Sequence, residues 1–316
     1  MSGDSRPPRG LSNSAGASGA GSAGSAVVGR VPAPLVFVVS AFSQYLGAGL
    51  AVSLFSLMPS TTVAWWRLVV GATVLMALRC PWRRSWTPKA LALAAAFGTA
   101  TATMNVIFYA AISLLPLGTV VSLEFLGTVA VAAFTGRGWR PRCAAVLALL
   151  GVVSISGLGV DLCESGQRTG VVLALAAGAA WAGYILLGRR VASAGSGIDS
   201  LAVGMVFGAL VYAPFAVGTA AGALASVRST AKALGVGLLS TAVPYGLDQV
   251  VLKRLGTDTF ALLSSLMPAT SMLVGAVVLG QLPSGWEVAG LVLVSVAVAL
   301  ASAEGRAPRP RHPECR

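Results

Sequence analysis

The sequence predicts an all-α membrane protein with ten transmembrane helices. Three observations carry this prediction: 56% of the 316 residues are hydrophobic, only 10% are charged, and the mean hydropathy is +0.82. These values lie far outside the range of soluble globular proteins. In lipid the backbone N–H and C=O groups must form hydrogen bonds with one another, which favours a helix. A helix that crosses the bilayer needs about 20 consecutive, mostly apolar residues.

Ten segments meet this requirement. They are 35–57, 61–80, 89–113, 116–135, 142–160, 169–188, 198–220, 232–252, 258–281 and 285–303. The connections between them are short. Several contain a proline at a place where a helix is expected to start or stop, namely Pro59, Pro88, Pro116, Pro141 and Pro283.

The two ends of the chain have a different composition. Residues 1–32 are rich in Gly, Ser and Ala, which predicts a disordered cytoplasmic tail, and residues 304–316 predict a basic cytoplasmic tail. The first stretch contains no compact apolar run of signal-peptide type, so the first hydrophobic segment is expected to remain as a helix.

The placement of the basic residues predicts the orientation. A net charge of +12 would suggest nucleic acid as a partner of a soluble protein. With the N-terminus inside, however, the outer connections contain only Arg168, Arg228 and Lys232. By the positive-inside rule, this predicts a multi-pass protein of the cytoplasmic membrane with both termini cytoplasmic. The expected partner is therefore the lipid bilayer, with no nucleic acid, and a homodimer is left open.

No enzyme chemistry is indicated. Cys80, Cys143, Cys163 and Cys315 are widely separated and the single histidine, His312, is in the tail, so we expect neither a metal site nor a cofactor. The sequence contains no Walker A loop for ATP hydrolysis. It also contains no nucleophile and base at matching depth, which argues against an intramembrane enzyme.

Three charged residues are expected within the membrane: Arg67, Glu124 and Asp248. A charge near the bilayer centre costs roughly 3 kcal/mol, so such residues usually face the protein interior or a water-filled cavity. Asp248 lies near the inner end of its segment, where a carboxylate that reaches the interface explains it equally well.

Arg67 and Glu124 are expected at the same depth as Asn105, roughly 9–12 Å below the outer surface at 1.5 Å per residue. Two hypotheses follow, and they are not exclusive. Arg67 and Glu124 form a fixed ion pair that holds helices together, or they line a translocation cavity.

Uncharged polar and aromatic residues accompany these charges. Tyr109 is four residues from Asn105 and hence on the same helix face. Trp181 and Tyr184 also share one face, away from the interfacial belts where such residues usually collect, although core packing explains them too. The remaining candidates for substrate contact are Gln44 and Tyr245.

Several segments resemble one known family. "NVIFYAAISLLPLGTVVSLEF" (105–125) closely resembles a segment of the threonine and homoserine exporters among the EamA-type drug/metabolite transporters. "FSQYLGAGLA" (42–51) looks like their first helix, and the stretch 65–83 like their second. "LALAAGAAWAGYILLGRR" (173–190) is similar to their sixth helix, and 238–269 to the eighth and the start of the ninth.

This resemblance implies ten helices in two inverted five-helix repeats, at 33–162 and 168–303. The sequence itself adds a faint echo between "SWTPKALAL" (85–93) and "RSTAKALGV" (228–236). Because each half would have an odd number of helices, a duplicated half must insert upside down. The family's carboxylates are changed at three positions, which here are Met267, Asp248 and Gln281.

The function expected from these observations is export of a small polar metabolite by alternating access. The resemblance implies amino acids such as threonine or homoserine as the substrate. Glu124 and Arg67 would match the ammonium and carboxylate groups of an amino acid, and Glu124 is the candidate for proton antiport. One alternative is an exporter of drugs or secondary metabolites with a pocket at Trp181, Tyr184 and Met267. Another is a structural or signalling membrane protein without transport.

Overall fold

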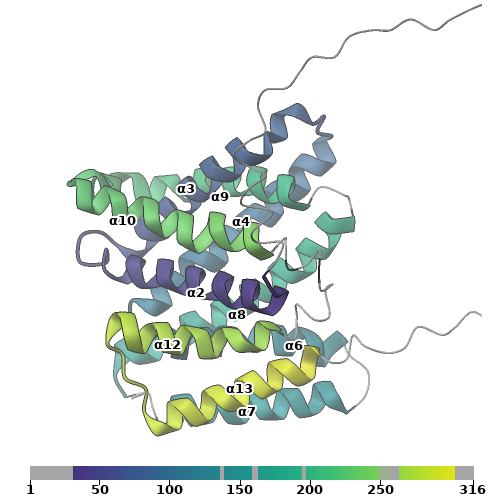
Figure 1. The fold of residues 1–316 in the computed structure, drawn as a ribbon, viewed down its shortest axis with the longest axis vertical. Coiled ribbons are helices and arrows are strands. Elements are labelled where there is room, and N and C mark those ends of the chain that lie inside the picture. The colour runs from purple at the N-terminus through teal and green to yellow at the C-terminus, as the bar shows by residue number, and fades with distance from the viewer. Residues whose placement is uncertain are drawn as a thin grey trace, which may run out of the picture.

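The computed structural model describes residues 31–135, 139–158, 163–193, 197–248, 251, 254 and 263–302, and within them it contains helices and no strand. The helices run side by side along one direction (Figure 1). In the first half they are α2 (Ala33–Val52), α3 (Ser60–Arg79), η1 (Pro81–Arg83), α4 (Pro88–Ile112), α5 (Leu117–Glu124), α6 (Leu126–Thr135) and α7 (Arg140–Leu158). In the second they are α8 (Ser165–Ser193), α9 (Gly197–Ala220), η2 (Ala221–Leu224), α10 (Val227–Gly237), η3 (Leu238–Ala242), η4 (Ser264–Leu266), α12 (Met267–Leu279) and α13 (Gly285–Ser302).

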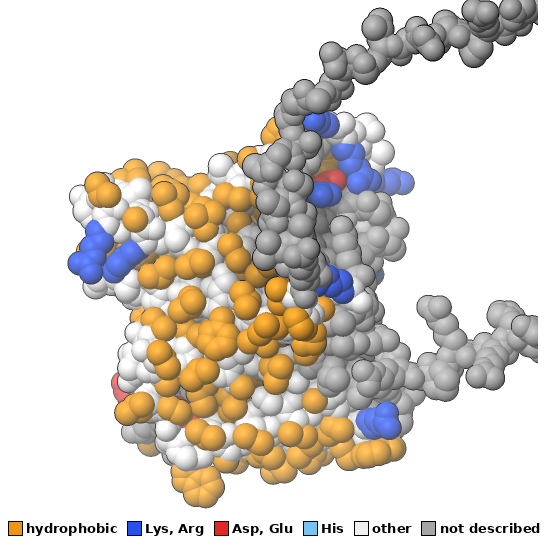
Figure 2. All heavy atoms as spheres, in the orientation of Figure 1, with side chains coloured by type: hydrophobic (Ala, Val, Ile, Leu, Met, Phe, Trp, Pro, Cys, Tyr) orange, Lys and Arg blue, Asp and Glu red, His pale blue; other side chains and the backbone are white. Residues whose placement is uncertain are grey.

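The molecule has the surface of a membrane protein. Four described spans are long and apolar enough to cross a bilayer, namely α2, α3, α4 and the span from Asp199 to Leu224. Four shorter apolar helices accompany them. Figure 2 shows hydrophobic side chains along the flanks of the helices and Lys and Arg side chains gathered near the helix ends. This distribution fits a bilayer that surrounds the flanks.

Each of the ten predicted segments contains a described helix, but several boundaries and details were wrong. The first helix ends at Val52, and residues 53–57 form turns instead of helix. The fourth segment is divided into α5 and α6 by a turn at Phe125. The eighth contains a π-helical stretch, η3, and the ninth is described only from residue 263. The predicted tails lie almost entirely outside the described residues.

Prolines and polar caps start the helices where the sequence suggested. Pro59 and Pro116 are N-cap residues, and Pro88 stands in the first turn of α4. Proline suits these positions because no intrahelical donor is needed there. Before α13, Ser284 and Glu287 form a capping box, in which the Ser284 N–H donates to Glu287 Oε2 over 2.7 Å.

Glycines allow two pairs of helices to approach closely at the centre of the bundle. A Cβ atom on Gly98 of α4 would overlap the backbone of Gly204 of α9. A Cβ atom on Gly127 of α6 would overlap the carbonyl oxygen of Gly178 of α8. Small residues give helices in lipid the close van der Waals contact that holds them together. The second contact places α8 directly beside Glu124.

Candidate functional site

A small cavity of about 60 Å³ lies inside the bundle. Side chains from α2, α3, α4, α5 and α8 meet there, so both halves of the chain contribute. The lining residues are Gln44, Tyr45, Ala48, Arg67, Met104, Asn105, Phe108, Glu124 and Trp181. The charged pair expected at one depth and its companion Asn105 therefore share one cavity.

Glu124 is the last residue of α5 and places its carboxylate in this cavity. The side chain is 7% exposed. The backbone behind it is fixed by α8, since a Cβ on Gly178 would come within 2.6 Å of the Glu124 carbonyl oxygen. Among the described residues, no hydrogen bond or ion pair reaches the carboxylate. A buried carboxylate without a partner is costly, and a cationic ligand would remove that cost.

Arg67 lines the same cavity, but its guanidinium is held by the eighth segment. Its Nε donates to Thr241 Oγ1 over 3.2 Å, and one terminal nitrogen donates to the Ser240 carbonyl oxygen over 2.9 Å. The described residues contain no ion pair between Arg67 and Glu124. The hypothesis of a fixed ion pair is therefore wrong for this conformation. The reason is that the guanidinium donors find neutral acceptors across the bundle.

The π-helical stretch η3 provides those acceptors. In a π-turn the backbone hydrogen bonds run from i to i+5, and such insertions often occur at functional sites. Within η3 the Leu239 carbonyl accepts a hydrogen bond from Ser43 Oγ over 2.9 Å, beside the Ser240 carbonyl that holds Arg67. The stretch thus ties α2 and α3 to the eighth segment at the level of the cavity.

Glycines on α2 and α3 make room for η3. A Cβ atom on Gly71 would come within 2.6 Å of Thr241 Cγ2, and one on Gly47 would overlap Ser240 Oγ. Both glycines face the residues that hold Arg67. A side chain at either glycine would displace Ser240 or Thr241, and these residues accept the hydrogen bonds of the Arg67 guanidinium.

Asn105 and Tyr109 of α4 have different surroundings. The Asn105 amide nitrogen donates to the Thr101 carbonyl over 2.8 Å, and its side chain faces the cavity. Tyr109 is fully buried outside the cavity lining, and its ring lies below the Arg67 guanidinium at 5.6 Å. Its hydroxyl has no hydrogen-bond partner among the described residues. Tyr109 supports Arg67 from behind instead of facing the cavity.

Two aromatic candidates on α8 are separated by the structure. Trp181 reaches the cavity and packs edge-on against Phe125, with ring centroids 4.6 Å apart. Tyr184 stacks on Phe97 at 4.9 Å, and Tyr245 packs into the same apolar cluster. Neither tyrosine is in the cavity lining.

Asp248 also lies apart from this cavity. Its Oδ1 accepts a hydrogen bond from Ser40 Oγ of α2 over 2.6 Å. Ser40 is buried, and the pair joins α2 to the eighth segment. Asp248 therefore has a structural contact in this conformation, a hydrogen bond that links α2 to the eighth segment.

Sequence reasoning missed Tyr45 as a cavity residue. It follows Gln44 directly and is only 3% exposed, although it is a phenol within a membrane span. The available signal was its position directly after Gln44, which was itself a candidate for substrate contact. Met267 and Tyr184, which were expected to form a pocket for drugs with Trp181, contact apolar clusters and do not line this cavity.

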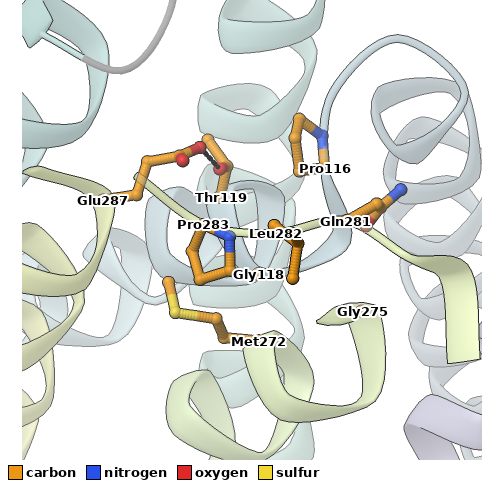
Figure 3. A pocket seen from close by; sticks show the side chains of 9 residues that line it. All are labelled: Pro116, Gly118, Thr119, Met272, Gly275, Gln281, Leu282, Pro283 and Glu287. Atoms are coloured by element: carbon orange, nitrogen blue, oxygen red, sulfur yellow. Dashed lines mark hydrogen bonds between the residues drawn. The ribbon is translucent and has the colours of Figure 1, made fainter. Parts of the chain in front are cut away.

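A second pocket of about 130 Å³ lies at the opposite end of α5 (Figure 3). Here Thr119 Oγ1 donates to Glu287 Oε1 over 3.0 Å, and the Leu117 N–H donates to Gln281 Oε1 over 3.0 Å. Figure 3 shows Thr119 and Glu287 pointing toward each other across the pocket, with Met272 below. Gln281 thus caps the N-terminus of α5. These contacts join the first half of the chain to the α12–α13 connection.

Comparison with known proteins gives consistent matches. Residues 168–303 match the EamA-like transporter family. The chain is 37% identical over 263 residues to the threonine/homoserine exporter RhtA of Salmonella typhimurium (strain LT2), which covers 83% of this chain and 88% of that protein. It is 38% identical over 249 residues to RhtA of Escherichia coli (strain K12), over 78% and 84% of the two chains.

A solved crystal structure has a similar fold. It is 18% identical in sequence, covers 85% of this chain and 96% of its own, and superposes with a TM-score of 0.56. At this identity the likeness concerns the arrangement of the helices alone.

Proposed function

Because the chain belongs to the EamA-like transporter family, we propose that it exports a small zwitterionic metabolite across the cytoplasmic membrane. An amino acid is the leading substrate class, and threonine and homoserine are the first compounds to test. Both relatives at 37–38% identity are named for these two amino acids. Family membership identifies the chain as a transporter and not an enzyme.

The observation that carries the substrate proposal is the unpaired Glu124 carboxylate in a cavity shared with Arg67. A free amino acid has an ammonium and a carboxylate on one carbon. The ammonium would pair with Glu124, and the carboxylate would approach the donors of Arg67 that Thr241 and Ser240 leave free. Since the described residues contain no ion pair between Arg67 and Glu124, both poles are available to a ligand.

The neighbouring groups supply neutral contacts. Gln44, Tyr45 and Asn105 offer amide and hydroxyl groups to a side-chain hydroxyl of the substrate. Trp181 closes one side of the cavity with an apolar face. Tyr184, Tyr245 and Asp248 would contact substrate only in another conformation of the transporter.

Alternating access between two inverted repeats is the proposed mechanism, and the packing of the helices supports it. If α2, α3, α4, α5 and α7 are matched with α8, α9, α10, α12 and α13, the contacts fall into pairs. Helix α4 packs on α8 and α9, as α10 packs on α2 and α3. Helix α5 packs on α8, as α12 packs on α2. The contacts α3–α9, α5–α12 and α7–α13 each map onto themselves. Such pairing is expected of a two-fold repeat.

The proposed orientation places both termini in the cytoplasm. The start of α2 and the end of α13 lie at the same end of the bundle, on the right in Figure 1. The connection with Arg79, Arg83 and Arg84 lies at this end too. The positive-inside rule assigns the end with more basic residues to the cytoplasm.

Efflux from preloaded cells tests the function. Cells that express the protein and are loaded with labelled threonine or homoserine should lose label faster than cells without it. Glu124→Gln, expressed at the parental level, should lower the rate by about tenfold or more, because a neutral amide no longer pairs with the ammonium. The matched control is Glu164→Gln, at an exposed carboxylate outside the cavity. Parental protein that gives no efflux above the empty strain would contradict the proposed substrate.

Proton antiport through Glu124 is a separate proposal. The same carboxylate would release its proton inward and bind the ammonium in exchange. In proteoliposomes an imposed pH gradient should drive amino-acid transport by the parental protein. Glu124→Gln should still exchange substrate for substrate, at its lowered rate, but lose the response to the gradient. An equal response in both proteins would exclude Glu124 from coupling.

A further inference from the structure

A long apolar groove runs along the outside of the bundle between α3 and α9, and its lining shares no residue with that of the central cavity. Its volume is about 470 Å³. The walls come from one face of α3, one face of α9 and the indole of Trp82 in η1. The α3 residues from Trp65 to Ala77 span twelve positions, which is about 18 Å of helix. Alanines at 72, 77, 209 and 213 leave the floor of the groove low.

The groove is apolar and nothing in the described part of the chain closes over it. Trp82 is 62% exposed and Leu210 is 63% exposed. Two of the polar groups that border it, on Trp65 and Thr73, are already satisfied within the protein. Trp65 Nε1 donates to the Ala209 carbonyl over 2.8 Å and bridges the two helices, and Thr73 Oγ1 donates to the Val69 carbonyl over 2.8 Å. A ligand between α3 and α9 would therefore contact the groove mainly through hydrocarbon, and the indole N–H of Trp82 marks its polar end.

The end of the groove at Trp82 carries a basic cluster. Arg79, Arg83, Arg84 and Lys89 are exposed in the connection from α3 to α4. Asp199 is their acidic neighbour among the described residues, with Arg79 Nε at 3.0 Å and Arg84 at 4.0 Å from its oxygens. Figure 2 shows this end of the molecule with several blue side chains around one red one. Positive charge therefore exceeds negative charge at the mouth of the groove.

We propose that this groove binds an anionic phospholipid of the cytoplasmic leaflet, with an acyl chain between α3 and α9 and the phosphate at Arg83 and Lys89. The groove has the elongated apolar shape of an acyl chain, and its charged end matches the anionic headgroups of that leaflet. Trp82 lies at the junction between the two regions, where an amphipathic ring is favoured. The assignment of this end to the cytoplasm rests on the proposed orientation, and it does not depend on the transported substrate.

The position of the groove gives the lipid a role in transport. It lies on the contact between α3 and α9, which belong to different halves of the chain. Movement of one half against the other would change the width of the groove. If the lipid binds one conformation of the groove more tightly than the other, its binding favours that conformation of the transporter.

Quenching of tryptophan fluorescence by brominated phospholipids tests the proposal on the full-length purified protein. Trp65 and Trp82 line the groove, so dibrominated acyl chains in it quench both. Brominated phosphatidylglycerol should quench at lower mole fraction than brominated phosphatidylcholine. Replacing both Trp65 and Trp82 by Phe should remove the lipid-specific part of the quenching, because the other tryptophans lie outside the groove.

Charge variants identify the headgroup site. In Arg83→Gln/Lys89→Gln the preference for phosphatidylglycerol should fall about fivefold for each charge removed. The matched control is Arg228→Gln/Lys232→Gln at the opposite end of the molecule, which should leave it unchanged. Ala77→Phe, at an exposed position in the groove, fills it without adding a tryptophan and should reduce quenching by both lipids.

Three results would overturn the proposal. Equal quenching by both lipids would show that the groove is covered by any bilayer lipid and has no preference for an anionic headgroup. A preference that survives loss of Arg83 and Lys89 would place the headgroup elsewhere. Groove tryptophans that no lipid quenches, in a protein that sediments as a dimer, would assign the groove to a second copy of the chain. Lipid binding is measured without transport, so its failure is distinguishable from failure of the export assay.

Discussion

At the level of single residues, the site depends on a carboxylate and a guanidinium that share a cavity without pairing. Glu124 has no partner among the described residues, and Arg67 is held by Thr241 and Ser240. An ion pair between them would lower the energy of the empty protein and compete with substrate. The separation keeps both groups ready for a ligand with two charges.

Arg67 is expected to be irreplaceable by lysine. Its guanidinium donates in two directions and lies over the ring of Tyr109, which an ammonium group cannot reproduce with the same geometry. Arg67→Lys should reduce efflux about tenfold or more, as removal of a paired donor from a buried site commonly does. Arg79→Lys, at an exposed ion pair with Asp199, is the control and should transport normally. Normal efflux by Arg67→Lys would mean that only the charge matters.

Tyr109 is expected to act through its ring. The hydroxyl is buried without a partner, so Tyr109→Phe should keep efflux at the parental rate and leave the melting temperature equal or higher. Tyr109→Leu removes the ring below Arg67 and should lower efflux several-fold, by about 1 kcal/mol or more of lost cation–π contact. A loss of efflux in Tyr109→Phe would show instead that the hydroxyl contacts substrate.

At the level of helices, close glycine contacts position the site. The Gly98–Gly204 contact sets the distance between α4 and α9, and η3 needs Gly47 and Gly71 opposite it. Gly98→Ala should destabilise the protein by about 1–3 kcal/mol, because the added methyl group meets backbone that cannot move aside. Gly183→Ala, where a Cβ atom has open space, is the matched control. Thermal stability in detergent, followed by size-exclusion chromatography, measures both.

The sequence predicted the helices better than the contacts between them. Hydropathy and helix rise were enough to bring Arg67, Asn105 and Glu124 to one depth. They could not show that Arg67 turns toward Ser240 and Thr241, since these residues are more than 170 positions away. The π-helical stretch and the turn at Phe125 were also missed, because both depend on packing against neighbouring helices. The inverted repeat, expected from the faint sequence echo and the family resemblance, stays a prediction.

At the level of the whole molecule, the pocket of Figure 3, which faces outward in the proposed orientation, is expected to open and close during transport. Two hydrogen bonds, Thr119 to Glu287 and Leu117 to Gln281, join the halves there. In a background without native cysteines, Met272→Cys should react with a membrane-impermeant thiol reagent added outside. Adding Thr119→Val should speed the reaction about fivefold, which corresponds to one lost hydrogen bond. An unchanged reaction rate would show that the hydrogen bond between Thr119 and Glu287 does not hold this pocket closed.

The central claim is that Glu124 and Arg67 bind opposite poles of one zwitterionic substrate. Competition against labelled homoserine in proteoliposomes tests it directly, with analogues that lack either the ammonium or the carboxylate group. The parental protein should prefer homoserine to both analogues. Glu124→Gln should lose only the preference for the ammonium, and Arg67→Gln only the preference for the carboxylate. If each variant weakens both preferences equally, or neither, the two residues do not read the two poles and the account of the site is wrong.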